Sequence, residues 1–275
     1  MNVAASAGAK SRYEFHKELA KCGKDAGAVY LCEEKVTHEY VACKSLDKKS
    51  HAYDADSINH EINIMKKLTH PNAVGLKQVF ENDRHVDIVM EYCPGLDLFD
   101  RLMDIERFTE SNAKILFKQL SGVVKSCHDN GIVHRDIKLE NIFLTKEDNQ
   151  CLDIKLGDFG FATYIKPGEK LNEFRGTLPY MAPEMLGRNH RSYDQAVDLW
   201  SAGVVLFELL TGTRAFDGET KSHIINKIKD VNLSFDPSLW NNISESAKDM
   251  VTGMLCKDPT ERLTATEVLN HPWMK

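Results

Sequence analysis

The stretch that decides the fold is residues 134–141, which read His134-Arg135-Asp136-Ile137-Lys138-Leu139-Glu140-Asn141. Three shorter patterns accompany it in one order along the chain. Val41-Ala42-Cys43-Lys44 precedes it, and Asp158-Phe159-Gly160 and Ala182-Pro183-Glu184 follow it. Either tripeptide is weak evidence by itself, because short motifs recur by chance. The four patterns in this order are strong evidence together.

In this order the patterns resemble the signature of the eukaryotic protein kinase family, and the resemblance runs from about Tyr13 to Lys275. It implies an α+β fold of two lobes, a small antiparallel sheet lobe with one helix and a larger, mainly α-helical lobe. It also implies a tail at 1–12 and a kinase domain at 13–275. Within that domain we expect the small lobe at 13–90, the hinge at 91–95 and the large lobe at 96–275.

The secondary structure that the residue patterns predict differs between the two parts of the chain. Before residue 92, short β-like runs dominate, and one helix interrupts them with apolar residues at helical spacing and Asp56 or Ser57 as its cap. That stripe consists of Ile58, Ile62, Met65 and Leu68. Helical patterns dominate later, at 96–103, 109–128, 197–210, 222–230, 244–255 and 264–269. In the second of these we expect Thr109 as the cap and one apolar face formed by Ile115, Leu116, Leu120, Val123 and Val124.

Composition excludes several classes of protein and partner. The 275 residues include 42% hydrophobic and 28% charged residues, which excludes disordered and fibrous proteins. The formal net charge of −6 argues against nucleic acid and anionic membranes as partners. The seven cysteines form no C-x-x-C pair, so we expect reduced thiols and a cytoplasmic location, with the nucleus as the alternative.

The resemblance assigns the acceptor side of phosphoryl transfer to the central stretch. Asp136 is expected as the catalytic carboxylate that orients a substrate hydroxyl, and Lys138 is expected to reach the γ-phosphate. Thr177, in the segment 176–180, is expected to brace Asp136. The D-x-K-x-x-N arrangement with this threonine is similar to kinases that act on serine and threonine. We therefore expect protein substrates with Ser/Thr acceptors.

ATP and Mg²⁺ are the cofactors that the resemblance implies. Lys44 on a strand is expected to grip the phosphates, and Glu61 on the following helix is expected to fix Lys44. Asn141 and Asp158 are expected as the metal ligands, because Mg²⁺ prefers hard oxygen donors. Around the adenine ring we expect Val29, Ala42, Met90, Glu91, Cys93 and Phe143.

The loop that should cover the phosphates departs from the family pattern G-x-G-x-x-G-x-V. Counting back from Val29 leaves Gly27 as one match of three, with Cys22 and Lys24 at the other glycine positions. A second register starts from Leu19 and places Ala20 at the first glycine. Glycines let backbone N–H groups approach phosphates closely, so we expect weaker ATP binding. The alternative function is a pseudokinase scaffold with an impaired loop.

Further stretches are similar to the calcium-dependent protein kinases of plants and protists, for example Leu269-Asn270-His271-Pro272-Trp273 near the end. The chain contains no D-x-D-x-D-G loop, so we expect no calcium site in it. Asp97 and Glu140 match positions where basophilic kinases engage arginines. We therefore expect a preference for Arg or Lys two or three residues before the acceptor, against the alternative of plain helix-end carboxylates.

The resemblance also implies three structural pairings. Arg135 needs an anion from the activation segment, residues 161–180, and we expect Glu169 or Glu173 to supply it without phosphorylation. A buried ion pair between Glu184 and Arg262 is expected to tie this segment to the late helices. Asp198 is expected to brace the catalytic loop.

Overall fold

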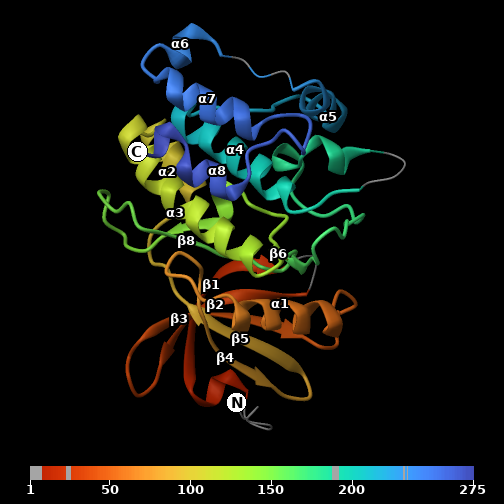
Figure 1. The fold of residues 1–275 in the computed structure, drawn as a ribbon. Coiled ribbons are helices and arrows are strands. Elements are labelled where there is room, and N and C mark those ends of the chain that lie inside the picture. The colour runs from red at the N-terminus through yellow and green to blue at the C-terminus, as the bar shows by residue number, and fades with distance from the viewer. Residues whose placement is uncertain (1–7, 23–25, 188–191, 232, 234) are drawn as a thin grey trace. The chain divides into compact units, whose positions relative to one another are not determined.

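The computed structural model divides the chain into two compact units, Met1–Thr69 with Val74–Cys93, and His70–Ala73 with Pro94–Lys275. It describes residues 8–22, 26–187, 192–231, 233 and 235–275. The first unit holds the sheet and one long helix, and the second holds most of the helices (Figure 1). The predicted α+β class, with a small antiparallel sheet part and a larger helical part, is confirmed.

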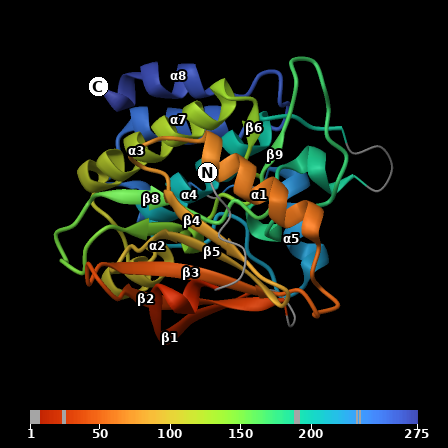
Figure 2. The same ribbon diagram turned by 90° about the horizontal axis from the view of Figure 1, so that it is seen from below.

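The smaller unit is built on a five-stranded antiparallel sheet in the order β1-β2-β3-β5-β4 (Figure 2). Its strands are β1 (Tyr13–Cys22), β2 (Gly27–Glu34), β3 (Tyr40–Asp47), β4 (Leu76–Glu81) and β5 (His85–Glu91). On one side, Ala9 of the short 3-10 helix η1 (Ala9–Ser11) packs with Tyr13, Phe80 and their neighbours into a buried cluster. Burial of this apolar face is the main force that holds the sheet together.

Helix α1 (Ala55–Lys67) lies beside the sheet and differs from the prediction at its start. Its cap is Asp54, whose side chain accepts a hydrogen bond from the Asp56 backbone N–H, so the prediction of Asp56 or Ser57 as the cap was wrong. Ile62 and Met65 of the predicted stripe are buried, and so is Ile64, which the prediction left out. Ile58 is only partly buried.

The larger unit is mainly helical. Its α-helices are α2 (Leu98–Ile105), α3 (Glu110–Asp129), α4 (Ala196–Thr211), α5 (Lys221–Asp230), α6 (Pro237–Trp240), α7 (Glu245–Met254) and α8 (Ala265–Asn270). Short strands form two small antiparallel pairs, β6 (Ile132–Val133) with β9 (Thr163–Tyr164) and β7 (Ile142–Leu144) with β8 (Ile154–Leu156). The remaining 3-10 helices are η2 (Leu139–Asn141), η3 (Leu178–Tyr180), η4 (Pro183–Leu186) and η5 (Pro272–Met274).

Helix α4 forms the centre of this unit. Every residue from Val197 to Thr211 is buried, and the helix packs against α3 and α7. A helix that is apolar all round is typical of a core position. Thr109 caps α3 as predicted, but Ile115 is exposed, so its place on the apolar face was predicted wrongly. None of the helices among the described residues is both long and apolar enough to cross a membrane.

Candidate active site

Lys44 and Glu61 form an ion pair inside the smaller unit. Lys44 lies on β3 and Glu61 on α1. The Lys44 Nζ donates to both carboxylate oxygens of Glu61, at 2.7 Å and 2.8 Å. The two side chains are mostly buried, 15% and 7% exposed. Because each charge has lost most of its water, the pair is held together tightly and the direction of the ammonium group is fixed.

Val29, Ala42 and Met90 lie on the same face of this sheet as Lys44. Val29 of β2 is opposite Lys44 of β3, and Ala42 of β3 is opposite Met90 of β5. Directly opposite residues in an antiparallel pair share a face, and so do residues two apart in one strand. One face of the sheet therefore presents three apolar side chains beside one ammonium group. This suits a flat base attached to phosphates.

The remaining residues expected near the base are divided between the units. Glu91 ends β5, and its Oε2 accepts a hydrogen bond from the Gly75 N–H at 3.2 Å, while Cys93 is the last residue of the smaller unit. Phe143 belongs to the larger unit. It lies on β7, opposite Lys155, with a backbone bridge to Asp97.

Gly27 has a structural reason to be glycine. Its φ is +146°, and a Cβ there would lie 2.0 Å from the backbone oxygen of Ser45 on β3. The β1 and β2 strands pair up to Cys22 opposite Gly27, with Ala20 opposite Val29. The hairpin therefore continues to the residues around its tip, but Gly23, Lys24 and Asp25, on which the choice of loop register depends, lie outside the described residues.

Asp136 is at the centre of a hydrogen-bond network in the larger unit. Its Oδ1 accepts from the Thr177 hydroxyl at 2.7 Å, and its Oδ2 accepts from the Asn141 amide nitrogen at 3.1 Å. The Lys138 Nζ lies 3.0 Å from Oδ2 and also donates to the Thr177 hydroxyl at 3.0 Å. Asp136 is only 4% exposed. Donors therefore hold both carboxylate oxygens, which fixes the orientation of the group.

Asn141 and Asp158 offer oxygen atoms that fit Mg²⁺. The Asn141 amide nitrogen donates to the Asp136 backbone oxygen at 2.8 Å and to its Oδ2. Because both partners are acceptors, the nitrogen must face Asp136, which leaves the carbonyl oxygen directed elsewhere. Asp158 is exposed, with a left-handed backbone of φ 54°. An amide oxygen and a carboxylate are suitable ligands for an ion that takes its other ligands from phosphates and water.

Asp198 of α4 fixes the start of the stretch 134–141 by binding its backbone. Fully buried, it accepts backbone N–H groups of His134 at 2.8 Å and Arg135 at 2.9 Å, and the His128 ring nitrogen lies 3.0 Å away. Burial acts to raise the pKa of Asp198, but the hydrogen bond and charge of His128 and the neighbouring donors outweigh it, so the pKa is lowered. Arg135 has the strained φ of 68°, which these bonds help to hold.

Two residues of the motifs, His134 and Phe159, pack internally. The rings of His134 and Phe159 meet edge to face with centroids 5.0 Å apart. His134 is completely buried and Phe159 is 1% exposed. The His134 Nε2 also lies 3.1 Å from the Gly157 backbone oxygen. These contacts tie the segment before Asp158 to the stretch that carries Asp136.

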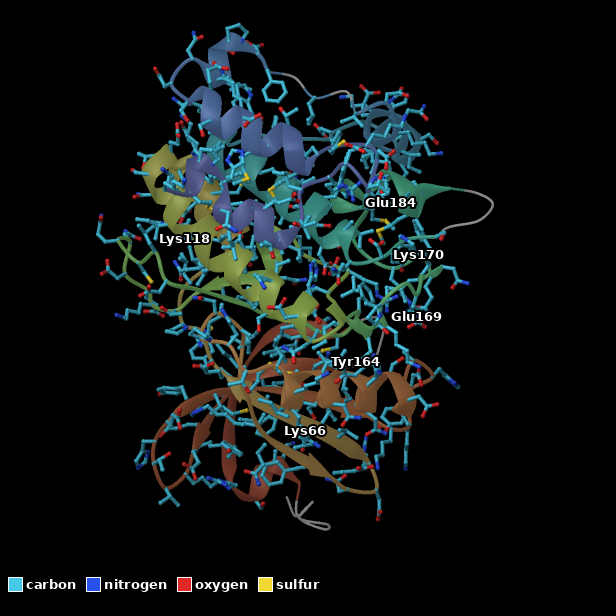
Figure 3. All side chains as sticks on the ribbon, viewed as in Figure 1. Lys66, Lys118, Tyr164, Glu169, Lys170 and Glu184 are labelled. Atoms are coloured by element: carbon cyan, nitrogen blue, oxygen red, sulfur yellow. The ribbon has the colours of Figure 1, made fainter. Side chains whose placement is uncertain are left out.

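Arg135 finds its anion in the activation segment. Its Nη1 donates to Glu173 Oε2 at 2.9 Å and to the Tyr193 hydroxyl at 3.3 Å. The Tyr193 hydroxyl in turn donates to the Glu173 backbone oxygen at 2.8 Å. Of the two expected partners, Glu173 makes the pair, while Glu169 (labelled in Figure 3) accepts from the Lys166 backbone N–H at 2.9 Å.

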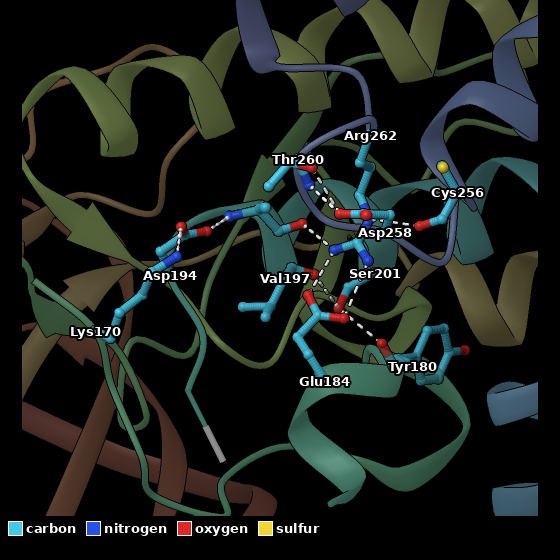
Figure 4. A network of polar contacts seen from close by, with 11 residues as sticks. Lys170, Tyr180, Glu184, Asp194, Val197, Ser201, Cys256, Asp258, Thr260 and Arg262 are labelled. Carbon is cyan, nitrogen blue, oxygen red and sulfur yellow. Dashed lines mark hydrogen bonds and ion pairs between the residues drawn. The ribbon is translucent and has the colours of Figure 1, made fainter. Parts of the chain in front are cut away.

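Glu184 and Arg262 form a bidentate ion pair (Figure 4). The Arg262 Nη1 and Nη2 donate to the two carboxylate oxygens at 2.7 Å and 3.0 Å. The guanidinium also donates to the backbone oxygens of Ala196 and Cys256 and lies 5.1 Å from the centroid of the Trp200 ring. Arg262 is 0% exposed and Glu184 is 13% exposed. The pair joins η4 to the start of α4 and the turn before α8.

Asp97 and Glu140 have different surroundings. The Asp97 Oδ1 accepts from the Asp100 N–H at 2.9 Å and caps α2, so the helix-end alternative describes at least this oxygen. Burial raises the pKa of Asp97, and the nearby charges of Asp100 and Glu140 add to the effect. The Oε2 of Glu140 is buried and has no hydrogen-bond donor among the described residues.

The sequence analysis did not single out a second polar network of this unit, formed by Glu208, Tyr180 and Arg214. The Tyr180 hydroxyl donates to Glu208 Oε2 at 2.8 Å, and Arg214 Nη1 lies 3.2 Å from the same hydroxyl. A signal for Glu208 was available, because it is the one charged residue in the apolar run 203–210. A buried charge in a core helix points to a polar network.

The comparisons with known proteins agree with this geometry. The family model described as "Protein kinase domain" matches residues 17–274. Calcium-dependent protein kinase 14 of Arabidopsis thaliana is 41% identical over 269 residues, which are 97% of this chain and 50% of the relative. Calcium-dependent protein kinase 20 of Oryza sativa subsp. japonica is 41% identical over 268 residues, 96% of this chain and 48% of the relative.

The chain spans about half the length of the curated relatives it matches. The family model, in contrast, covers nearly all of this chain, from the first strand to the last 3-10 helix. The chain therefore belongs to the protein kinase family.

Proposed function

We propose that the protein transfers the γ-phosphoryl group of Mg·ATP to serine or threonine hydroxyls of proteins. The observation that carries this proposal is the network in which Thr177, Asn141 and Lys138 hold the Asp136 carboxylate. A carboxylate fixed by donors on both oxygens has one orientation for a substrate hydroxyl. Positioning of this kind, with electrostatic stabilisation, supplies most of the catalysis in phosphoryl transfer.

On the acceptor side, Asp136 accepts the hydrogen of the substrate hydroxyl and directs the oxygen toward the phosphorus. The Lys138 ammonium, 3.0 Å from both Asp136 Oδ2 and the Thr177 hydroxyl, offers positive charge to the transferring group. Thr177 fixes the rotamer of Asp136. The acceptor expected for this set is serine or threonine.

On the nucleotide side, Lys44 binds the phosphates with a direction set by Glu61, and the apolar face of Val29, Ala42 and Met90 suits the adenine ring. Asn141 and Asp158 would hold Mg²⁺. The metal, when bound, neutralises charge on the phosphate oxygens. The exposed carboxylate of Asp158 and the Asn141 carbonyl oxygen, which is turned away from Asp136, support this role.

We infer a preference for basic residues upstream of the acceptor. The support is the carboxylate of Glu140, whose Oε2 is buried without a donor among the described residues, and the neighbouring charge of Asp97. A peptide guanidinium would satisfy such an oxygen through a charge-assisted hydrogen bond. We also infer activity without phosphorylation of the activation segment, supported by the ion pair between Arg135 and Glu173.

Radiolabelled transfer from ATP tests the proposal. The purified chain is incubated with Mg²⁺, γ-labelled ATP and peptides that place serine, threonine or tyrosine after two arginines. We expect label on serine and threonine, a requirement for Mg²⁺, and loss of at least about a thousandfold in turnover for Asp136→Asn, since positioned acid–base groups and orientation contribute factors of this size. Label on tyrosine alone would contradict the assignment of the acceptor.

A pseudokinase scaffold is the alternative, and thermal unfolding separates the two. An enzyme is expected to show a rise in melting temperature with ATP that depends on Mg²⁺, because ligands that bind only the native state stabilise it. Asp153→Asn, a change of an exposed carboxylate on the loop before β8, is the matched control for Asp136→Asn. No nucleotide shift and no turnover in the wild-type chain would favour the scaffold.

A further inference from the structure

Three carboxylates of the larger unit form an acidic cluster, and one of them, Glu208, has an arginine of the chain as its ion-pair partner. The acidic cluster consists of Asp97 before α2, Glu140 in η2 and Glu208 in α4. Glu140 is close enough to influence both others: burial raises the pKa of Glu208 to about 7, with the charge of Glu140 contributing. Burial also raises the pKa of Asp97, and the charges of Asp100 and Glu140 add to that effect. The arginine is Arg214, in the turn that follows α4.

Arg214 is held by contacts to three different segments. Its Nη1 donates to the Tyr180 hydroxyl at 3.2 Å and lies 3.8 Å from Glu208 Oε1. Its guanidinium carbon is 5.3 Å from the centroid of the Phe99 ring and 5.8 Å from that of Tyr180. A guanidinium over two aromatic rings and beside a carboxylate is a favourable arrangement for a cation.

The cation requirement of the cluster is only partly met. Glu208 is 2% exposed, and its Oε1 has no hydrogen-bond donor among the described residues although Arg214 is its ion-pair partner. Glu140 Oε2 is likewise buried without a donor in this part of the chain. Buried carboxylate oxygens without donors are costly, so a further cation would be bound favourably there.

We propose that Arg214 is a specificity-determining residue, an internal counter-ion that takes the place beside Glu208 that a basic side chain of the substrate would otherwise occupy. The inference rests on the proposed function. A substrate guanidinium meets the like charge of Arg214 and is left with Glu140 and Asp97 alone. The preference for basic residues is therefore weaker than three carboxylates would give.

Paired peptides measure this effect. Each pair differs only in arginine against norleucine at two, or at three, residues before a serine, and kcat/KM is determined for each peptide. In Arg214→Ala we expect the arginine-to-norleucine ratio at one of these positions to rise about tenfold, since a charge-assisted bond to a buried carboxylate becomes available. Arg107→Ala, which removes an exposed arginine and the same net charge, should leave the ratio unchanged.

Two further variants separate charge from packing. Arg214→Gln keeps a side chain over Phe99 and Tyr180 without the charge and should also raise the ratio, which decides the matter if Arg214→Ala does not fold. Arg214→Ala combined with Glu208→Gln should return the arginine-to-norleucine ratio to within about twofold of wild type. In this double variant residue 208 is no longer a carboxylate that could bind the peptide arginine. A ratio that is unchanged or lower in folded Arg214→Ala or Arg214→Gln overturns the proposal.

Direct peptide binding keeps this test independent of catalysis. Fluorescence anisotropy with the same peptides, labelled at the amino terminus, gives the ratio of dissociation constants without turnover. If wild type binds peptides but transfers no phosphoryl group, the proposed enzyme function fails while the anisotropy ratio still tests Arg214. A tenfold rise in that ratio supports the role of Arg214, and an equal ratio in wild type and variant contradicts it.

Discussion

Breaking the Glu184–Arg262 ion pair should cost stability before it costs catalysis. Glu184→Gln keeps one acceptor oxygen but removes the charge, so one of the two bonds, at 2.7 Å and 3.0 Å, is lost or weakened. The Arg262 guanidinium stays fully buried with only backbone oxygens and the Trp200 ring as partners. Losing one partner of a buried pair costs about 3–5 kcal/mol. Because the glutamine keeps one acceptor, we expect about 3 kcal/mol.

Urea unfolding followed by tryptophan fluorescence measures this loss, since Trp200 contacts Arg262 directly. The matched control is Asp129→Asn, which breaks the exposed Lys125–Asp129 pair of α3 and should cost no more than about 1 kcal/mol. Under conditions where most of the Glu184→Gln protein is folded, its turnover should fall only in proportion to the fraction of molecules that are unfolded. A Glu184→Gln protein that is no less stable than Asp129→Asn would show that the buried ion pair does not stabilise the fold.

Three other variants test separate parts of the structure. Glu173→Gln should lower kcat/KM about fivefold, because its half-exposed pair with Arg135 contributes about 1 kcal/mol at most; phosphatase treatment of wild type should change nothing, and a large loss after phosphatase would speak against an intrinsic anion. Burial is the main cause that raises the pKa of Glu208 from 4.5 to about 7, so Glu208 binds a proton more tightly in the native state than in the unfolded chain. Stability should therefore fall by about 3 kcal/mol as pH rises from 4.5 to 7; Glu208→Gln should flatten this part of the unfolding profile, and equal slopes would contradict the assignment. Asp198→Asn places an amide N–H against a backbone donor and should cost about 3 kcal/mol in urea unfolding; a change below about 0.5 kcal/mol would show that Asp198 does not hold the loop.

The sequence predicted the pairings that depend on motif chemistry. Glu61 lies on the helix after Lys44, and the structure shows their ion pair within one unit. Thr177 and Asp136 are 41 residues apart and are joined by a hydrogen bond, as expected from the motif. In both cases a charged or polar group with one clear partner type determines the contact. The catalytic roles of these residues stay predictions.

Helix details were less predictable, because they depend on where the first turn begins. Asp54, Asp56 and Ser57 are all suitable caps, and only the backbone of Asp54, at φ −129°, lies in the extended region that a cap requires. Ile115 was placed on the apolar face of α3, but it precedes Leu116, and one residue turns the side chain by about 100° around the helix. Leu116 is fully buried and Ile115 is 47% exposed.

The contacts of Arg214 with Glu208 and Tyr180 could not be predicted from local patterns. Glu208, Tyr180 and Arg214 come from α4, η3 and the turn after α4, and their contact depends on how these elements pack. The sequence predicted only a helix over 197–210, whose part 203–210 is apolar except for Glu208. A charge inside such a run was the available warning that a buried partner existed.

The role of Asp136 in phosphoryl transfer is tested most directly by measuring two quantities for Asp136→Asn, the turnover and the dissociation constant for Mg·ATP. We expect phosphoryl transfer to a serine peptide to fall by at least about a thousandfold, while the dissociation constant for Mg·ATP stays within about threefold of wild type. Asp136 would then act on the acceptor hydroxyl and not on nucleotide binding. Turnover within about tenfold of wild type in a folded Asp136→Asn protein would contradict the claim.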